Sequence, residues 1–248
     1  MKQERFSGKV VLVTGSTAGI GLAVAARFKQ EGATVIVCSR KPMAVQTTRQ
    51  ELQCDGIVCN VSHAKDRKGL IEYVAQQHGR VDVLVLNAAT SLSFGDSGNC
   101  SEAQWDKMMD TNLKSCWLLS KEVVPLMPSN SSIILLSSYA AYNPDTPLGV
   151  YAVTKTALLG LTKLLANEYG RSHRIRVNSV APGVIKTKFS KLLWEIDAIR
   201  EVCERNSPLG RVGTVEEVAG PVAFLASDDA SYITGECIVI AGGTHCRL

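Results

Sequence analysis

Short, almost continuously apolar runs recur along the chain, alternating with segments whose apolar residues are three or four positions apart. The apolar runs span residues 9–14, 34–39, 56–60, 81–86, 132–137, 175–180 and 237–241. Runs of this length, rich in Val and Ile, predict strands that are covered on both faces, as in a parallel sheet. The intervening segments predict helices over residues 19–31, 43–54, 65–78, 101–128, 150–169 and 214–226.

This alternation over 248 residues predicts an α/β fold with a doubly wound parallel sheet. No linker, low-complexity tract or repeat interrupts it, so we expect residues 1–248 to form one domain for cofactor binding and catalysis. The longest segment outside the strand rhythm lies at about residues 186–213. Because it comes after the C-terminal end of a strand, where open α/β sheets bind ligands, it predicts a substrate or lid loop.

Composition argues against several classes of protein. The chain is 46% hydrophobic, and its net charge of +4 is spread along the sequence, so a nucleic-acid binder has little support. The 8 cysteines show neither C-x-x-C spacing nor a cluster with histidine, so we expect no metal site. Those in apolar runs, such as Cys38 and Cys237, predict buried, reduced thiols.

The two ends of the sequence bear on its location. The charged N-terminal residues lack the apolar core of a signal peptide, and no apolar run is long enough to span a bilayer. We therefore expect a protein that is neither secreted nor membrane-spanning. Cys246, Arg247 and Leu248 form a small–basic–leucine tripeptide, as in signals that an import receptor reads for peroxisomes. A peroxisomal and a cytoplasmic location both stay open.

The stretch "TGSTAGIG" (residues 14–21) directly follows the first predicted strand and opens the first predicted helix. Gly15, Gly19 and Gly21 allow a tight turn, a close approach of backbone to a pyrophosphate, and packing of the helix on the sheet. The free N–H groups at the helix start then face the phosphates. Glycine is common in any tight turn, but this position after the first strand predicts a Rossmann-like dinucleotide site.

The end of the second predicted strand bears on the choice of cofactor. Ser39, Arg40 and Lys41 stand there, where a dinucleotide fold that prefers NAD(H) carries an acid for the ribose hydroxyls. Two cations suit a 2′-phosphate, so we predict NADP(H). The alternative is that they are solvated charges at a helix start, where cations are slightly unfavourable.

Four polar side chains occupy positions that a parallel sheet would bring together. Asn112 interrupts an apolar helix, Ser138 follows the fifth predicted strand, and "YAVTK" places Tyr151 and Lys155 one helical turn apart. Strand ends and helix starts meet at the carboxyl edge of a parallel sheet, so these groups can converge on one site. The alternatives are that "YAVTK" is the first turn of an ordinary structural helix, and that Asn112 bonds a neighbouring carbonyl.

With these motifs the chain resembles the short-chain dehydrogenase/reductase family over essentially its whole length. "TGSTAGIG", "NAA", Asn112, Ser138, "YAVTK" and "PGVIKT" occur in the family's order and spacing. The resemblance implies seven parallel strands in the order 3-2-1-4-5-6-7, assembly as a homotetramer, and hydride transfer from a nicotinamide cofactor without a metal.

The resemblance also implies roles for the polar group. Tyr151 would protonate the substrate oxygen, Ser138 would orient the carbonyl, and Asn112 would hold a water that relays protons. The ordinary pKa of tyrosine is about 10, so we expect Lys155 and the oxidised nicotinamide to lower that of Tyr151. Lys155 would also bond the nicotinamide ribose.

The same resemblance places a larger set of residues against the cofactor. They are Gly15, Ser16, Thr17, Gly19, Ile20, Gly21, Ser39, Arg40, Lys41, Asn60, Val61, Asn87, Ala88, Ala89, Tyr151, Lys155, Pro182, Gly183, Ile185 and Thr187. The family often has Asp at the position of Asn60, Gly at Ala89 and Asp at Ala241, and none of these departures removes a group that moves a proton.

The sequence therefore predicts an NADPH-dependent reductase of apolar or aromatic ketones, α-dicarbonyls or retinal. Ser138, Phe94, Leu148, Phe189 and Trp194 are the candidate substrate contacts, although the apolar ones also suit lid packing. One alternative is a 3-oxoacyl-thioester reductase, which would use the same catalytic group. A cofactor-binding regulator without turnover is the alternative from another class, and the presence of Tyr151 and Lys155 counts against it.

Overall fold

The computed structural model describes residues 4–144 and 148–244, so the predicted targeting tripeptide at 246–248 lies outside the described residues. All strands join one parallel sheet in the order β3-β2-β1-β4-β5-β6-β7, which confirms the predicted fold. The strands are β1 (Val10–Thr14), β2 (Thr34–Ser39), β3 (Asp55–Val58), β4 (Val83–Leu86), β5 (Ser132–Leu136), β6 (Arg176–Pro182) and β7 (Cys237–Ile240). The order reverses between β1 and β4, where such sheets bind ligands.

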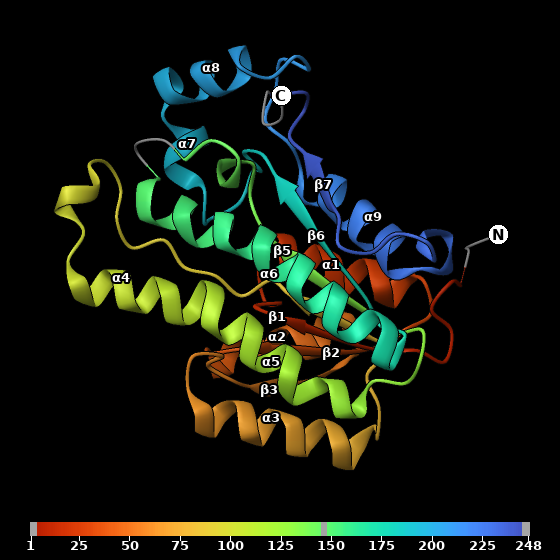
Figure 1. The fold of residues 1–248 in the computed structure, drawn as a ribbon. Coiled ribbons are helices and arrows are strands. Elements are labelled where there is room, and N and C mark those ends of the chain that lie inside the picture. The colour runs from red at the N-terminus through yellow and green to blue at the C-terminus, as the bar shows by residue number, and fades with distance from the viewer. Residues whose placement is uncertain (1–3, 145–147, 245–248) are drawn as a thin grey trace.

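Helices cover both faces of the sheet (Figure 1). They are α1 (Gly19–Gln30), α2 (Pro42–Leu52), α3 (Ala64–Gln77), α4 (Glu102–Met109), α5 (Ser115–Val123), α6 (Gly149–His173), α7 (Lys191–Glu195), α8 (Asp197–Arg205) and α9 (Val215–Ala226). The buried residues of α3, α5 and α6 pack on one face, and those of α1 and α9 pack on the other.

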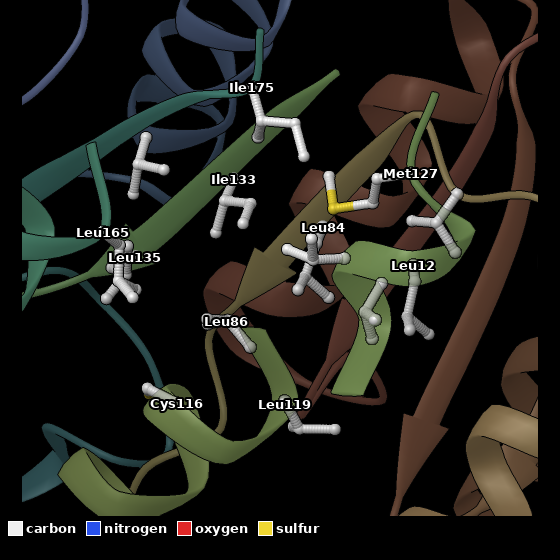
Figure 2. Packing of buried hydrophobic residues seen from close by; sticks show 14 of the residues in the cluster. Leu12, Leu84, Leu86, Cys116, Leu119, Met127, Ile133, Leu135, Leu165 and Ile175 are labelled. Atoms are coloured by element: carbon white, nitrogen blue, oxygen red, sulfur yellow. The ribbon is translucent and has the colours of Figure 1, made fainter. Parts of the chain in front are cut away.

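Successive residues of the central strands contribute to different cores, because side chains alternate across a strand. Leu12 and Leu84 belong to the core under α5 and α6, whereas Val11, Val13 and Val85 belong to the core under α1 and α9. Figure 2 shows the first of these cores, where side chains of β1, β4 and β5 lie among residues of α5 and α6. Burial on both faces explains why these strands are apolar throughout.

The segment predicted as one helix over residues 101–128 is less regular than its apolar pattern indicates. Between α4 and α5 lies a π-helical turn, Asp110–Lys114, in which the Ser115 N–H donates to the carbonyl of Asp110, five residues earlier. A 3₁₀ turn, Val124–Leu126, comes after α5. Such π-turns are rare and frequently occur at functional sites. This one contains Asn112.

The segment predicted as a lid carries two helices, α7 and α8, which lie together at the top of Figure 1. Ala198, Ile199 and Val202 recur at helical spacing in α8 and line a cavity beneath it. The segment is therefore helical in part rather than an open loop, although no residue of α7 or α8 is buried, and its role as a lid stays a prediction.

Candidate active site

The turn between β1 and α1 leaves no room for side chains. Gly15 has a φ of +62°, and a Cβ there would lie 2.9 Å from the Cα atom of Ala88. At Gly21 a Cβ would lie 2.4 Å from both the Asn87 amide nitrogen and the Gly15 carbonyl oxygen. The Asn87 Nδ2 atom donates to the carbonyls of Thr14 and Gly15 at 3.0 and 2.9 Å. Asn87 thus holds the turn, and the two glycines are sterically required.

The start of α1 is open to an anion. Its N-cap residue is Ala18, so no side chain caps the first N–H groups, and the first turn carries no acidic residue. Ala18, Gly19 and Ile20 all line a cavity in front of the helix. Uncapped N–H groups and the helix dipole together favour a negatively charged ligand at this position.

That cavity has a volume of about 720 Å³ and runs from the glycine turn to α6. Most of the residues predicted to bind the cofactor line it. They are Gly15, Thr17, Gly19, Ile20, Gly21, Ser39, Arg40, Lys41, Asn60, Val61, Asn87, Ala88, Ala89, Tyr151, Lys155, Pro182 and Thr187. We call it the cofactor cavity.

Three predicted cofactor residues lie elsewhere. Ser16 is fully buried, and its hydroxyl donates to the Val13 carbonyl at 2.7 Å and accepts from the Cys38 N–H at 2.9 Å. Ser16 therefore ties β1 to β2 and does not face the cavity. Gly183 and Ile185 line the two neighbouring cavities instead.

Positive charge surrounds the cofactor cavity. Its lining contains Arg40, Lys41, Lys107, Lys155 and Lys188, and no Asp or Glu stands among the described lining residues. Lys107 and Lys188 were not predicted, although each is near a predicted residue in sequence. A cavity with several cations and no carboxylate fits a ligand that carries phosphates.

Tyr151, Lys155 and Ser138 converge where β5 ends and α6 begins, as predicted. All three are buried, with exposed fractions of 8%, 2% and 7%. The Lys155 Nζ atom lies 5.5 Å from the centroid of the Tyr151 ring and donates to the Leu136 carbonyl at 2.7 Å. The Ser138 side chain is close enough to Tyr151 to lower the pKa of its hydroxyl, and it accepts from the Ala140 N–H at 3.2 Å. The Tyr–Lys pair is therefore not a surface pair, and its catalytic role stays a prediction.

The pKa of Tyr151 is raised in this structure, opposite to the prediction. Burial disfavours the phenolate more than the Ser138 side chain favours it, and the nearby Tyr139 raises the pKa further. Burial also lowers the pKa of Lys155 to about 8, against a smaller opposing effect of Cys116. The prediction considered the charge of Lys155 without the cost of burying both groups.

Asn112 is fully buried in the π-turn and links three segments. Its Oδ1 atom accepts from the Thr90 N–H, and its Nδ2 atom donates to the Thr90 carbonyl, both at 2.8 Å. The Nδ2 atom also donates to the Thr154 hydroxyl at 3.1 Å. Asn112 thus bonds a neighbouring carbonyl, as the alternative held, and joins the loop after β4 to α6. Its part in a proton relay stays a prediction.

A smaller chamber of about 290 Å³ adjoins the cofactor cavity. The predicted substrate contacts Ser138, Phe94, Leu148 and Phe189 line it, together with Tyr151. Tyr139, Leu192 and Leu193 also line it. Tyr151 and Phe189 line both cavities, and their ring centroids are 5.7 Å apart. Apolar side chains make up much of the lining, and several serine and threonine hydroxyl groups complete it.

The predicted substrate contact Trp194 does not line the chamber. Its Nε1–H donates to the Thr187 carbonyl at 2.8 Å, and the Lys186 Nζ atom lies 5.1 Å from its ring. Trp194 therefore packs the loop before α7 and holds Thr187 at the rim of the cofactor cavity. The sequence could not show that this indole turns back on its own segment.

A third cavity, of about 1260 Å³, lies between α8 and β7. It shares Phe94, Tyr139, Leu148 and Leu193 with the chamber. Neither Tyr151 nor Lys155 lines it, although it is the largest of the three. The titratable pair therefore identifies the two smaller cavities, and not this one, as the place for chemistry.

Two kinds of feature are absent from residues 4–144 and 148–244. Within these ranges, no helix is long and apolar enough to cross a membrane. In the same part of the chain, no three His, Cys, Asp or Glu side chains are grouped as metal ligands would be.

Comparisons with known proteins agree with this geometry. Residues 15–245 match the family described as enoyl-(acyl carrier protein) reductase. The chain is 48% identical to dehydrogenase/reductase SDR family member 4 of Bos taurus, covering 100% of this chain and 91% of that protein. It is 45% identical to tropinone reductase-like 3 of Erythroxylum coca, covering 98% and 96%.

Solved structures give the same result. A glucose/ribitol dehydrogenase of this class from Brucella melitensis superposes with a TM-score of 0.93 at 29% identity, covering 100% of both chains. Aldohexose dehydrogenase of Thermoplasma acidophilum superposes at 0.89 with 32% identity, covering 100% and 98%. Fold, site and sequence agree, and the chain belongs to the short-chain dehydrogenase/reductase family of oxidoreductases.

Proposed function

We propose that the protein is an NADPH-dependent carbonyl reductase acting on apolar or aromatic ketones, α-dicarbonyls and aldehydes such as retinal. One observation carries the proposal. A cationic cavity that suits a phosphorylated cofactor meets an apolar chamber at the buried Tyr151 hydroxyl and its neighbour Ser138. The name of the bovine relative, a dehydrogenase/reductase, supports the same class of reaction.

The residues present fit a nicotinamide dinucleotide. The glycine turn excludes side chains, the start of α1 is uncapped, and the lining is cationic. The Thr111 hydroxyl, which borders the cavity, is buried and has no partner among the described residues. The exposed Arg40 and Lys41 at the end of β2 favour a 2′-phosphate, and hence NADP(H) over NAD(H). Lys155 lines the same cavity and would bond a ribose hydroxyl of the nicotinamide end.

When bound in this cavity, a reduced nicotinamide would supply the hydride for the carbonyl carbon. The proton for the carbonyl oxygen comes from the Tyr151 hydroxyl, which stays protonated at neutral pH because burial raises its pKa. Ser138, which lines the same chamber and lowers the pKa of Tyr151, holds the carbonyl oxygen beside that hydroxyl. The apolar lining of the chamber excludes water from this transfer.

Loss of the proton leaves a phenolate, which the apolar surroundings destabilise. The Lys155 ammonium, 5.5 Å from the ring, offsets this cost. Proton return to Tyr151 requires a path from solvent. Asn112 keeps the loop at Thr90 in contact with α6, and we assign it the support of a water on that path.

A 3-oxoacyl-thioester reductase is the second candidate, because the matched family is described by a reductase of acyl-carrier substrates. The chamber favours the first candidate, because its size and lining suit a compact apolar carbonyl compound. An acyl thioester also carries a long phosphate-containing group, for which the described residues of the chamber lining offer no cation. Comparing a simple aromatic ketone with an acetoacetyl thioester separates the two.

The test is NADPH oxidation by the purified protein with an aromatic α-dicarbonyl, with Tyr151→Phe as the control. We expect turnover in the unaltered protein and a loss of roughly 10²–10⁴-fold in the variant, with NADPH binding retained. Tight NADPH binding without turnover of any carbonyl would instead support the non-catalytic regulator.

A further inference from the structure

One contact at the cofactor cavity has no role in the proposed reaction. The Lys107 Nζ atom on α4 donates to the Ser62 hydroxyl, 3.0 Å away in the turn after β3. Lys107 lines the cavity, as do Asn60 and Val61 beside Ser62. The contact therefore joins α4 to the turn after β3 beside the cavity.

The charge of Lys107 is not used in an ion pair within the described residues. The acid three residues further along the chain, Asp110, pairs with Lys114 at 3.0 Å. One helical turn after Lys107, the Thr111 hydroxyl is buried at the same cavity and has no hydrogen-bond partner in the described part of the chain. Lys107, whose charge is opposed by no carboxylate in the described residues, and Thr111, whose hydroxyl has no partner there, thus line one region of the cavity four residues apart.

The residues after β3 are joined by hydrogen bonds among their own side chains. The Ser62 hydroxyl donates to the Asn60 Oδ1 atom at 2.9 Å, and the Asn60 Nδ2 atom lies 3.1 Å from the His63 Nε2 atom. Lys107, Ser62 and Asn60 therefore form one hydrogen-bonded chain along the end of β3. Its position differs from that of Arg40 and Lys41, which come after β2 and border the cavity at another strand end.

The backbone around Lys107 is held firmly. Ser101 and Gln104 form a capping box at the start of α4, and the Gln104 side chain donates to the Leu92 carbonyl at 2.8 Å. The π-turn with the buried Asn112 fixes the other end of α4. The backbone that carries Lys107 is thus held at both ends of α4.

Building on the proposed function, which supplies the dinucleotide, we propose that Lys107 binds the adenosine end of the cofactor and acts there beside Asn60 and Thr111. Its ammonium can donate to a ring nitrogen or lie against the base as a cation on an aromatic face. Adenosine is common to NADPH and NADH, whereas the 2′-phosphate is not. Lys107 therefore strengthens the binding of both dinucleotides, and Arg40 and Lys41 choose between them.

The test is equilibrium binding without substrate, measured by nicotinamide fluorescence and by calorimetry. The full-length protein, Lys107→Met and the control Lys114→Met are each titrated with NADPH, NADH and reduced nicotinamide mononucleotide, which lacks adenosine. Lys114 lies nearby in the π-turn and does not line the cavity. Methionine keeps the apolar stem of lysine and removes the charge.

We expect Lys107→Met to weaken the binding of NADPH and of NADH alike, by roughly tenfold, and to leave the binding of the mononucleotide unchanged. Lys114→Met should bind all three ligands as the unaltered protein does. Weakening of NADPH alone would place Lys107 at the 2′-phosphate and overturn the inference. Equal weakening of the mononucleotide, or no change at all, would also overturn it. If the unaltered protein binds neither dinucleotide, the proposed function fails as well, so the two failures are distinguishable.

Discussion

The Lys155 ammonium lies 5.5 Å from the centre of the Tyr151 ring and gives its hydrogen bond to the Leu136 carbonyl. The two groups are therefore held side by side on α6 without bonding each other directly. Burial has opposite effects on them, raising the pKa of Tyr151 and lowering that of Lys155, because it disfavours each charged form.

Lys155 should cost stability at neutral pH. Its pKa is about 8 in the folded chain and 10.5 ordinarily, so the unfolded chain binds more protons between these values. The free energy of unfolding therefore rises with pH between about 8 and 10.5. Below pH 8 the buried ammonium lowers it by about 3 kcal/mol. Lys155→Met removes the cost but leaves the Leu136 carbonyl unpaired, so we expect a net gain of about 2 kcal/mol at pH 7.

That gain should shrink as the pH rises from about 8 to 10.5, because the folded lysine is then neutral. Urea unfolding at a series of pH values measures it. Lys163→Met, an exposed position on the same helix, is the matched control and should show no such trend. A Lys155→Met variant whose stability runs parallel to that of the unaltered protein would contradict the burial argument.

The choice between NADPH and NADH should depend on the end of β2. Replacing Arg40 and Lys41 by Ala removes the two exposed cations there, so KM for NADPH should rise roughly tenfold or more. KM for NADH should hardly change, since NADH has no 2′-phosphate. Steady-state kinetics with both cofactors measure this. Arg49→Ala, on α2 but outside the cofactor cavity, should leave the ratio unaltered.

Gly21 should not tolerate a methyl group. A Cβ would lie 2.4 Å from the Gly15 carbonyl oxygen and from the Asn87 amide, and the former cannot move without opening the turn. Gly21→Ala should lose about 1–3 kcal/mol of stability and bind NADPH more weakly. Gly69→Ala, in α3 with open space around its Cβ, should instead stabilise by about 0.5–1 kcal/mol. Thermal unfolding of the pair provides the comparison.

Phe189 and Trp194 should have separable effects, although they are close in sequence. Phe189→Ala opens the wall shared by the chamber and the cofactor cavity, so KM for an apolar ketone should rise several-fold. Trp194→Phe loses the hydrogen bond to the Thr187 carbonyl and should cost about 1 kcal/mol of stability. Its effect on the KM for the ketone should be smaller. The reverse order of effects would restore Trp194 as a substrate contact.

Most of the fold follows from local pattern. The strands β1, β2, β4 and β5 are buried on both faces, so nearly every residue had to be apolar, and the pattern could be recognised without any contact information. Tyr151 and Lys155 were also predictable, because helical spacing places them on one side of α6. The glycine turn was recognisable from its place directly after β1.

Other features depend on the folded arrangement. Lys107 and Lys188 have the local pattern of solvated lysines, and only the sheet edge brings them to the cofactor cavity. The direction of the pKa shift of Tyr151 could not be inferred, because it balances burial against neighbouring groups in three dimensions. Ser16 shows the converse, a motif residue whose hydroxyl is used inside the sheet.

The π-turn between α4 and α5 also divides one long helical segment into two parts with different surroundings. Lys107 and Thr111 border a polar cavity, whereas Cys116, Leu119 and Val123 lie in the dry core against the sheet. The π-turn contains one more residue than an α-helical turn. The residues after it therefore point in a different direction around the helix axis than a regular α-helix would give them, and no loop is needed. Deleting one residue there would rewind the segment as a regular helix. The cofactor wall and the core could then no longer be in register at the same time.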